Sequence, residues 1–470
     1  MDAAENRRAE LMRRGLLAMV TALLVARPLV LGEDPGLQYS LSSVSGLIVS
    51  MLWLVTAVAW AAWRARFGQG TGIFGWVEAG LATVVALVFL SSLAGAHYKH
   101  PAILIACEWL IVFLVLLLVR QLARRPEDLR GLMAVMVASA ASLSPDALYQ
   151  AAIDLPRTRA LASDPDKLRA ELVKINKVLA AEDPELEYWK NRLGQNNVYA
   201  TYAHPNAFAG YLALLLPVAL GWALAALRGR TQTWRITGAF ACAALPAICL
   251  WLTHSRGAIL GTLLAVGAAL AFYWRHVWWP RRAWVLAGVA GVGLAMFAAA
   301  RTETGAYLLA RATRSFGLRT EYWSATLGII RDYAWLGVGA GNFGQIYPRY
   351  MSASAYEQIK DPHNFVLELA ASNGVLAMLA LLATLGIFFW KVGGAWFMAN
   401  GKGNEPDNPA FTAASSPPSN RRLDLFVGGI AGILLGFLFR AADLSAEQLP
   451  LETALSCLRS VIWFAAFGLL

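Results

Sequence analysis

Residues 360–391 read KDPHNFVLELAASNGVLAMLALLATLGIFFWK and join a polar turn to a long apolar run. The apolar part, residues 374–391, carries no charged side chain before Lys391. It has the roughly 17–25 residues that an α-helix needs to cross the ~30 Å hydrocarbon core of a bilayer. This stretch therefore predicts a membrane-spanning helix that follows a polar segment outside the membrane.

The rest of the chain repeats this pattern. Of its 470 residues, 58% are hydrophobic and 15% are charged, which indicates an integral membrane protein with an all-α, polytopic fold. The apolar runs of spanning length predict about twelve transmembrane helices, at residues 15–32, 43–63, 75–95, 102–120, 130–153, 205–227, 236–254, 257–274, 283–300, 374–391, 423–441 and 453–470.

Two polar segments, 154–203 and 301–373, are too long to be simple connections, and the order of the spans places both on the outer face. The first predicts a charged helical insert, either a solvated cap on the membrane surface or an element that selects a substrate. The predicted parts are N-terminal transmembrane helices (1–153), the outer-face helical insert (154–203), central transmembrane helices (204–300), an outer-face catalytic loop (301–373) and C-terminal transmembrane helices (374–470) with a disordered linker at 400–421.

Basic residues predict the orientation, because Lys and Arg are enriched in cytoplasmic loops. With the N-terminus inside, the inner segments hold twenty Lys and Arg residues, whereas the short outer loops hold only Lys99 and Arg256. This asymmetry explains the net charge of +10 without a nucleic-acid partner. Both long polar segments then lie on the outer face of the membrane.

Neither a disulfide framework nor a metal site is predicted. The four cysteines all fall inside predicted spans, where a thiol behaves as a small apolar side chain. His97 and His100 form an isolated H-x-x-H, and Asp164 and Asp166 form an isolated D-x-D. Neither pair has the further ligands that a metal site needs.

The sequence LTHSRGAILGTLL, residues 252–264, places a cation at a helix start. Ser255 is a good N-cap, which puts Arg256 in the first turn and His254 just before it. The positive end of the helix dipole disfavours Arg there. A bound phosphate would gain from the free N–H groups, the dipole and the guanidinium together. The alternative is an Arg that reaches the lipid headgroups.

A second arginine is predicted at a helix start in residues 315–343, SFGLRTEYWSATLGIIRDYAWLGVGAGNF. Its apolar residues recur at helical spacing and predict an amphipathic helix at the membrane interface, with Arg319 in the first turn. The GVGAGNF that follows has no strand before it, so it predicts a tight turn and not a dinucleotide loop. The apolar stripe consists of Leu318, Tyr322, Ala325, Ile329 and Tyr333.

The DPHNF motif predicts a short helix over 362–372, with Asp361 as its cap, Pro362 at its first position and Gly374 after its end. His363 is then in the first turn, where the helix dipole should hold the imidazole pKa below its reference value of about 6.5. A neutral imidazole can accept a proton. The alternative is a histidine that only forms hydrogen bonds at the interface.

Four motifs in this order resemble the bacterial O-antigen ligase family, which shares a fold with O-antigen polymerases: AHPNAFAGYLALLLP, THSRGAILG, LRTEYWSATLGIIRDYAWLGVGAGNF and DPHNFVLELAASNGVLAMLALL. The resemblance runs from about residue 200 to 391. It implies a glycosyltransferase that moves a preassembled glycan from undecaprenyl pyrophosphate to lipid A core, with no metal or nucleotide cofactor. In the matching motifs, Arg256 and Arg319 correspond to the pyrophosphate-binding arginines and His363 to the catalytic histidine. The possible supporting residues are His254, Ser255, Asn206 and Asn364.

The resemblance implies an inverting enzyme in the bacterial inner membrane, with a periplasmic active site and contacts to membrane lipids. The 154–203 insert is longer than a minimal ligase needs, so an O-antigen polymerase and a protein O-oligosaccharyltransferase are alternatives. A transporter or flippase of lipid-linked glycan would explain the many spans equally well. It would not explain a histidine held on a short outer helix.

Overall fold

The computed structural model describes residues 3–30, 41–68, 75–174, 193–229, 231–273, 301–352, 359–401, 423–442 and 448–470, with a few isolated positions between them. All regular elements in this part of the chain are helices, and nine of the helices described are long and apolar enough to cross a membrane. The all-α, multi-pass prediction is therefore confirmed, whereas the count of twelve spans is not.

Three of the predicted spans account for the difference. Helix α1 (Ala3–Leu29) covers the first, but Arg13, Arg14 and Arg27 leave it only a short uncharged stretch. Helix α12 (Arg256–Tyr273) contains a shorter apolar helix, Arg256–Ala271. The predicted span 283–300 lies outside the described residues except for isolated positions, and so does the predicted linker beyond residue 401.

The chain divides into two units, each assembled from distant segments. Unit 1 takes its described residues from 1–63, 122–272 and 407–470, and unit 2 from 64–121 and 273–406. Besides α1 and α12, unit 1 contains most of α2 (Leu41–Phe67), α5 (Pro126–Ser142), α6 (Ser144–Tyr149), η2 (Gln150–Asp154), α7 (Leu155–Ala162), α8 (Pro165–Lys174), α10 (Pro205–Arg228), α11 (Thr233–Leu252), α20 (Leu423–Ala442) and α21 (Leu449–Leu469). Unit 2 contains α3 (Trp76–Leu90), η1 (Ser91–Gly95), α4 (Lys99–Leu122), α15 (Glu303–Asp332), α16 (Phe343–Ile346), η4 (Tyr347–Arg349), α17 (Phe365–Asn373) and α18 (Val375–Gly401).

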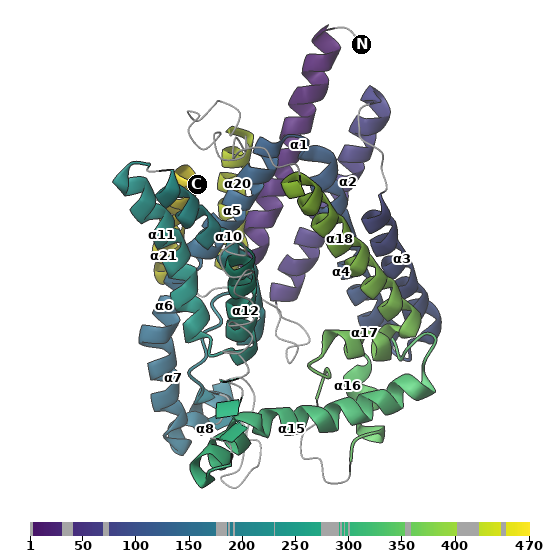
Figure 1. Ribbon diagram of the computed structural model, residues 1–470, viewed down its shortest axis with the longest axis vertical. Coiled ribbons are helices and arrows are strands. Elements are labelled where there is room, and N and C mark those ends of the chain that lie inside the picture. Colours follow the sequence, from purple (N-terminus) through teal and green to yellow (C-terminus); the bar gives the residue numbers. More distant parts are fainter. Residues whose placement is uncertain are drawn as a thin grey trace. The chain divides into compact units, whose positions relative to one another are not determined.

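In unit 1, α1 and α20 lie side by side because glycines remove the side chains between them (Figure 1). A Cβ at Gly428 would lie 2.4 Å from the Ala18 carbonyl oxygen, and one at Gly432 would lie 2.5 Å from that of Ala22. Small residues four positions apart let helix backbones approach closely in this way within membranes. The α1–α20 pair is therefore a specific contact and not a general apolar one.

The two ends of unit 1 are held by different contacts. At one end, Arg13 bonds to Asp128 at 3.2 Å and Arg14 bonds to Asp424 at 2.9 Å. At the other end, Gln150 donates to the Ala200 carbonyl at 2.9 Å, just before α10 begins at Pro205. In unit 1, Arg13 and Arg14 thus pair with acidic residues of α5 and α20 at the end away from the start of α10.

The helical run Pro126–Ala162 is longer than the predicted span 130–153. Its 37 residues extend for about 55 Å at 1.5 Å per residue, well beyond a ~30 Å hydrocarbon core. The predicted insert 154–203 therefore begins inside this helical run, where η2 ends at Asp154 and α7 begins at Leu155, and its boundary at 154 stays a prediction. Beyond the run, the insert contributes α8, where Leu168 and Leu172 pack with Leu186 in a small apolar cluster.

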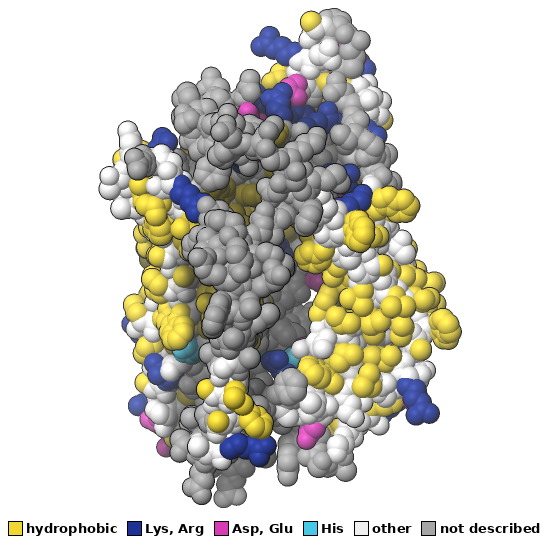
Figure 2. Space-filling view, viewed as in Figure 1, with side chains coloured by type: hydrophobic (Ala, Val, Ile, Leu, Met, Phe, Trp, Pro, Cys, Tyr) yellow, Lys and Arg dark blue, Asp and Glu magenta, His cyan; other side chains and the backbone are white. Residues whose placement is uncertain are grey.

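In unit 2, α3 packs along α18, and Val84, Leu369 and Leu381 contribute to a buried core beside α4. Figure 2 shows hydrophobic side chains gathered over the part formed by α3, α4 and α18. Phe389 and Trp390 of α18 are among the exposed ones. An exposed apolar surface of this size suits contact with lipid. Helix α15 runs across the direction of these three helices (Figure 1).

A backbone junction holds the turn after α15 against the end of α17. Val338 N–H donates to the Ala371 carbonyl at 2.9 Å, and Val375 N–H donates to that of Ala334 at 2.8 Å. Gly374 ends α17 at φ 88°, as the sequence predicted, and a Cβ there would lie 2.1 Å from the Trp335 carbonyl oxygen. Glycine is required here both for its φ and for the close approach.

We expect Gly374→Ala to destabilise the protein by about 1–3 kcal/mol or more, since it adds backbone strain and a backbone clash. Thermal unfolding of the detergent-purified protein measures the loss. Gly386→Ala in α18 is the matched control, because its Cβ meets no atom within 4 Å. Alanine should be neutral or stabilising there, by up to ~1 kcal/mol. Equal melting temperatures for the two variants would contradict this account.

Candidate functional site

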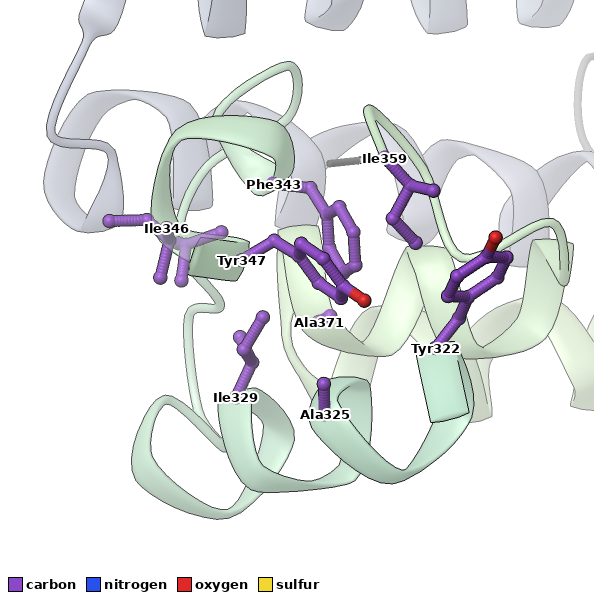
Figure 3. Close-up of a cluster of buried hydrophobic side chains, with 9 residues drawn as sticks. Tyr322, Ala325, Ile329, Phe343, Ile346, Tyr347, Ile359 and Ala371 are labelled. Atoms are coloured by element: carbon purple, nitrogen blue, oxygen red, sulfur yellow. The ribbon is translucent and has the colours of Figure 1, made fainter. Parts of the chain in front are cut away.

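The apolar stripe of α15 forms the base of the candidate site in unit 2. Tyr322 and Ile329 are 4% and 0% exposed, and they pack with Phe343, Tyr347 and Ala371 from α16, η4 and α17 (Figure 3). The stripe was predicted to face the membrane interface, and this is wrong for the side chains described. The residues that follow α15 fold back and cover the stripe with protein.

His363 lies just before α17 and not within it. The Asn364 side chain accepts hydrogen bonds from Val366 N–H at 3.1 Å and Leu367 N–H at 3.3 Å, so Asn364 is the N-cap. The helix therefore begins at Phe365, three residues later than predicted. His363 is therefore not in the first turn of α17, as was predicted. The expectation that the helix dipole keeps its imidazole neutral depended on that position.

Asp361 instead determines how His363 is held. One carboxylate oxygen, Oδ1, accepts from His363 N–H at 2.8 Å and also lies 2.8 Å from the imidazole Nδ1. This contact places the ring proton on Nδ1 and the basic lone pair on Nε2. An Asp–His pair of this kind orients an imidazole and stabilises its protonated form once a proton is taken.

Two aromatic residues of α15 anchor this turn. The Tyr322 ring meets the His363 ring edge to face, with centroids 6.1 Å apart. The Trp323 indole N–H donates to the Pro362 carbonyl at 3.1 Å. Half of the His363 side chain, 52%, nevertheless stays exposed and accessible to a substrate.

Glu368, on α17, is a second titratable group near His363 that the sequence analysis missed. Burial raises its pKa, the charge of Asp361 raises it further, and His363 acts in the opposite direction. The sequence signal was a single acidic residue in the otherwise uncharged helix FVLELAASN. Its pKa shift shows that the carboxyl group responds to both Asp361 and His363.

Arg319 lies in the middle of α15 and not in its first turn. No proline interrupts residues 303–317, and a glycine such as Gly317 lowers helix propensity by only ~1 kcal/mol, so the helix begins at Glu303. Arg319 is exposed and makes no hydrogen bond or ion pair with any described residue. It is three residues before Tyr322, which places it on the helix side that carries the Tyr322–His363 contact.

Unit 1 brings together the starts of α10 and α12. Helix α12 begins at Arg256, as predicted, and the Ser255 hydroxyl donates to Asn206 Oδ1 at 2.8 Å. His204 caps α10 by accepting from Asn206 N–H at 3.1 Å. Arg256 is exposed and forms no ion pair or hydrogen bond within the part of the chain that the structure describes. Two helix starts and a guanidinium thus adjoin one another, an arrangement that favours an anion.

Both candidate-site histidines adopt a strained backbone. In the described ranges, three non-glycine residues have positive φ: Ala200, His254 (53°) and His363 (51°). Such a conformation costs of order 1–3 kcal/mol and is found mainly where function requires it. The sequence analysis did not predict these positive φ values. The GVGAGNF segment forms the predicted turn, with Gly337, Gly339 and Gly341 at positive φ.

Residues 239–382 match the family model for O-antigen ligases. This range includes Arg256, Arg319 and His363, and the match confirms over this range the resemblance drawn from the motifs. No curated protein and no solved structure matches the chain.

Proposed function

We propose that this chain, which carries an O-antigen ligase family domain at residues 239–382, transfers a preassembled glycan from undecaprenyl pyrophosphate to an acceptor hydroxyl. Lipid A core is the proposed acceptor, and the periplasmic face of the inner membrane is the proposed location. The observation that carries the proposal is the Asp361–His363 pair, in which Asp361 Oδ1 lies 2.8 Å from Nδ1 of a half-exposed imidazole.

In the proposed reaction, His363 Nε2 takes the proton of the acceptor hydroxyl while that oxygen attacks the anomeric carbon. The bond between the anomeric carbon and the phosphate oxygen breaks, and undecaprenyl pyrophosphate leaves with its electron pair. Asp361 stabilises the resulting imidazolium. Attack opposite the leaving group inverts the anomeric configuration.

The two arginines are proposed to bind the pyrophosphate. A guanidinium can donate two parallel hydrogen bonds to phosphate oxygens. Arg256 has the additional support of the α12 N-terminus and of Ser255, held by Asn206 at 2.8 Å. Arg319 is exposed on the side of α15 that carries Tyr322, whose ring contacts His363.

Transfer by the purified full-length protein tests this function directly. In phospholipid nanodiscs with undecaprenyl-pyrophosphate glycan as donor, we expect a product with lipid A core. Extension of a second lipid-linked glycan would instead identify a polymerase, and modification of a peptide hydroxyl would identify a protein-glycosylating enzyme. Passage of the donor across proteoliposomes with no transfer to any acceptor would overturn the proposal in favour of a flippase.

Sidedness gives a separate prediction. In a Cys-free background, we expect Lys174→Cys, at the end of α8, to react with an impermeant thiol reagent in cells with a permeabilised outer membrane. Gly229→Cys, at the end of α10, should not react, because Gly229 lies between Arg228 and Arg230, which are predicted to be on the inside. Labelling at Gly229 would reverse the orientation and move the proposed site to the cytoplasm.

A further inference from the structure

One carboxylate next to the proposed base has no role in the proposed step. Glu368 lies on α17 one turn above the N-cap, since its N–H donates to the Asn364 carbonyl at 2.8 Å. Leu369, the next residue, packs into the core shared by α3, α4 and α18. Ala371 packs instead with Tyr322 of α15 (Figure 3). These two contacts fix the face of α17 that carries Glu368.

This face adjoins the histidine. Residues three apart on a helix lie on the same side, so Glu368 is on the side of α17 on which Ala371 packs with Tyr322. The Tyr322 ring in turn meets the His363 ring edge to face, with centroids 6.1 Å apart. The charges of Asp361 and His363 both act on the Glu368 carboxyl. Glu368 and the half-exposed imidazole therefore border the same space.

The Glu368 carboxylate lacks a hydrogen-bond donor. It makes no hydrogen bond or ion pair with the residues that the structure describes, and its oxygens are not closed to a water-sized molecule. Burial and the charge of Asp361 both raise its pKa, so its surroundings disfavour the ionised form. A partly buried polar group without a partner costs free energy. A donor supplied by a ligand would remove this cost.

The neighbouring groups limit what this ligand can be. Asp361 and Glu368 repel a pyrophosphate, so the acceptor is favoured over the donor phosphates on this side of His363. Within the described ranges, no group of side chains is arranged to hold a metal ion. A hydroxyl is a neutral donor. The proposed reaction already brings one acceptor hydroxyl to His363, and a sugar carries a second on a neighbouring carbon. A serine or threonine side chain carries only one.

We propose that Glu368 accepts a hydrogen bond from a second hydroxyl of the acceptor, next to the hydroxyl that gives its proton to His363. Glu368 is then a specificity-determining residue, and the acceptor is a sugar with two neighbouring hydroxyls. This inference rests on the proposed function and deepens it, because it favours a sugar acceptor over the single hydroxyl of a protein side chain.

Transfer by the full-length protein in nanodiscs tests this contact. The probes are lipid A core with its terminal sugar intact and the same acceptor with single hydroxyls of that sugar removed. In the wild type, removal of the attacking hydroxyl should abolish transfer. Removal of one neighbouring hydroxyl should lower kcat/KM about tenfold or more, the range expected for a lost hydrogen bond to a charged group.

Variants of Glu368 connect this preference to the carboxylate. Glu368→Ala should use the intact and the neighbour-deoxy acceptor almost equally. This ratio is measured within one preparation, so it does not depend on the fraction of folded protein. Glu368→Gln keeps an oxygen that accepts a hydrogen bond, so it should retain part of the preference and most of the rate at saturating acceptor. Glu321→Ala, which removes an exposed carboxylate of α15, is the matched control and should keep the full preference.

Three results would overturn the inference and leave glycan transfer in place. The first is equal use of the intact and all neighbour-deoxy acceptors by the wild type. The second is a loss in Glu368→Ala that is the same for the intact and the deoxy acceptors, which would assign the carboxylate to His363. The third is transfer to a serine or threonine peptide as efficient as transfer to the sugar. Absence of transfer to any acceptor would instead contradict the proposed function, and the inference with it.

Discussion

His363→Ala should lose about 10²- to 10⁴-fold of the transfer rate, the range that a positioned general base contributes. Asp361 holds Nδ1 at 2.8 Å, so Nε2 is the atom that takes the proton, and alanine offers no substitute. Initial rates in nanodiscs measure the loss. Thermal unfolding and donor binding should match the wild type, because half of the side chain is exposed and its backbone bond to Asp361 remains.

Further variants separate base catalysis from positioning. His363→Gln keeps a hydrogen bond but accepts no proton usefully, so it should be nearly as poor as alanine. Near-wild-type transfer by this variant, or a product with retained configuration, would show that the histidine only positions the acceptor. Asp361 is a positioning residue. Asp361→Asn should lower the rate and move its fall on the acidic side to lower pH, because the imidazolium loses a stabilising charge.

Glu368 gives the sharpest control on the pH dependence. Burial and Asp361 raise its pKa, so as the pH falls Glu368 becomes neutral before an ordinary glutamate does. The wild-type rate should fall in acid because His363 becomes protonated. Glu368→Gln should keep most of the activity at neutral pH. Loss of transfer in Glu368→Gln together with activity in His363→Gln would assign the base to the carboxylate.

Arg256→Lys and Arg319→Lys should each reduce transfer roughly tenfold or more. Lysine keeps the charge but not the forked pair of hydrogen bonds, and one hydrogen bond to a charged group contributes about 1.5–3 kcal/mol. The loss should appear chiefly as a raised KM for the lipid-linked donor, measured at saturating acceptor. Arg319→Ala should be worse than Arg319→Lys, since the charge is lost as well.

Arg331→Lys is the control for Arg319 on the same helix, because Arg331 is exposed in the last turn of α15. It should transfer at the wild-type rate. Full activity of the lysine variants at both Arg256 and Arg319 would make these residues headgroup anchors, and the donor-site proposal would fail. A loss confined to one arginine would leave the pyrophosphate with a single protein cation.

Residue pattern alone was sufficient where the physical signal is local. The apolar runs predicted an all-helical, multi-pass protein, because the hydrocarbon core offers no water and a helix satisfies the backbone N–H and C=O groups internally. Ser255 and Gly374 correctly marked the start of α12 and the end of α17. Helix caps and stops depend on a few neighbouring residues, so they can be read from sequence.

Tertiary structure decided the rest. Asp361 and Asn364 are both good caps, and local sequence could not show that Asn364 caps α17 while Asp361 holds His363. In this arrangement Tyr322 contacts the His363 ring and Trp323 donates to the Pro362 carbonyl. Both aromatic residues are some forty residues away in the chain. Arg319 is not at a helix start, because helix formation is cooperative and α15 continues through Gly317, which is only a weak helix breaker. The pairing of Asp146 with Arg459 depends on helices α6 and α21 meeting, which no local pattern encodes.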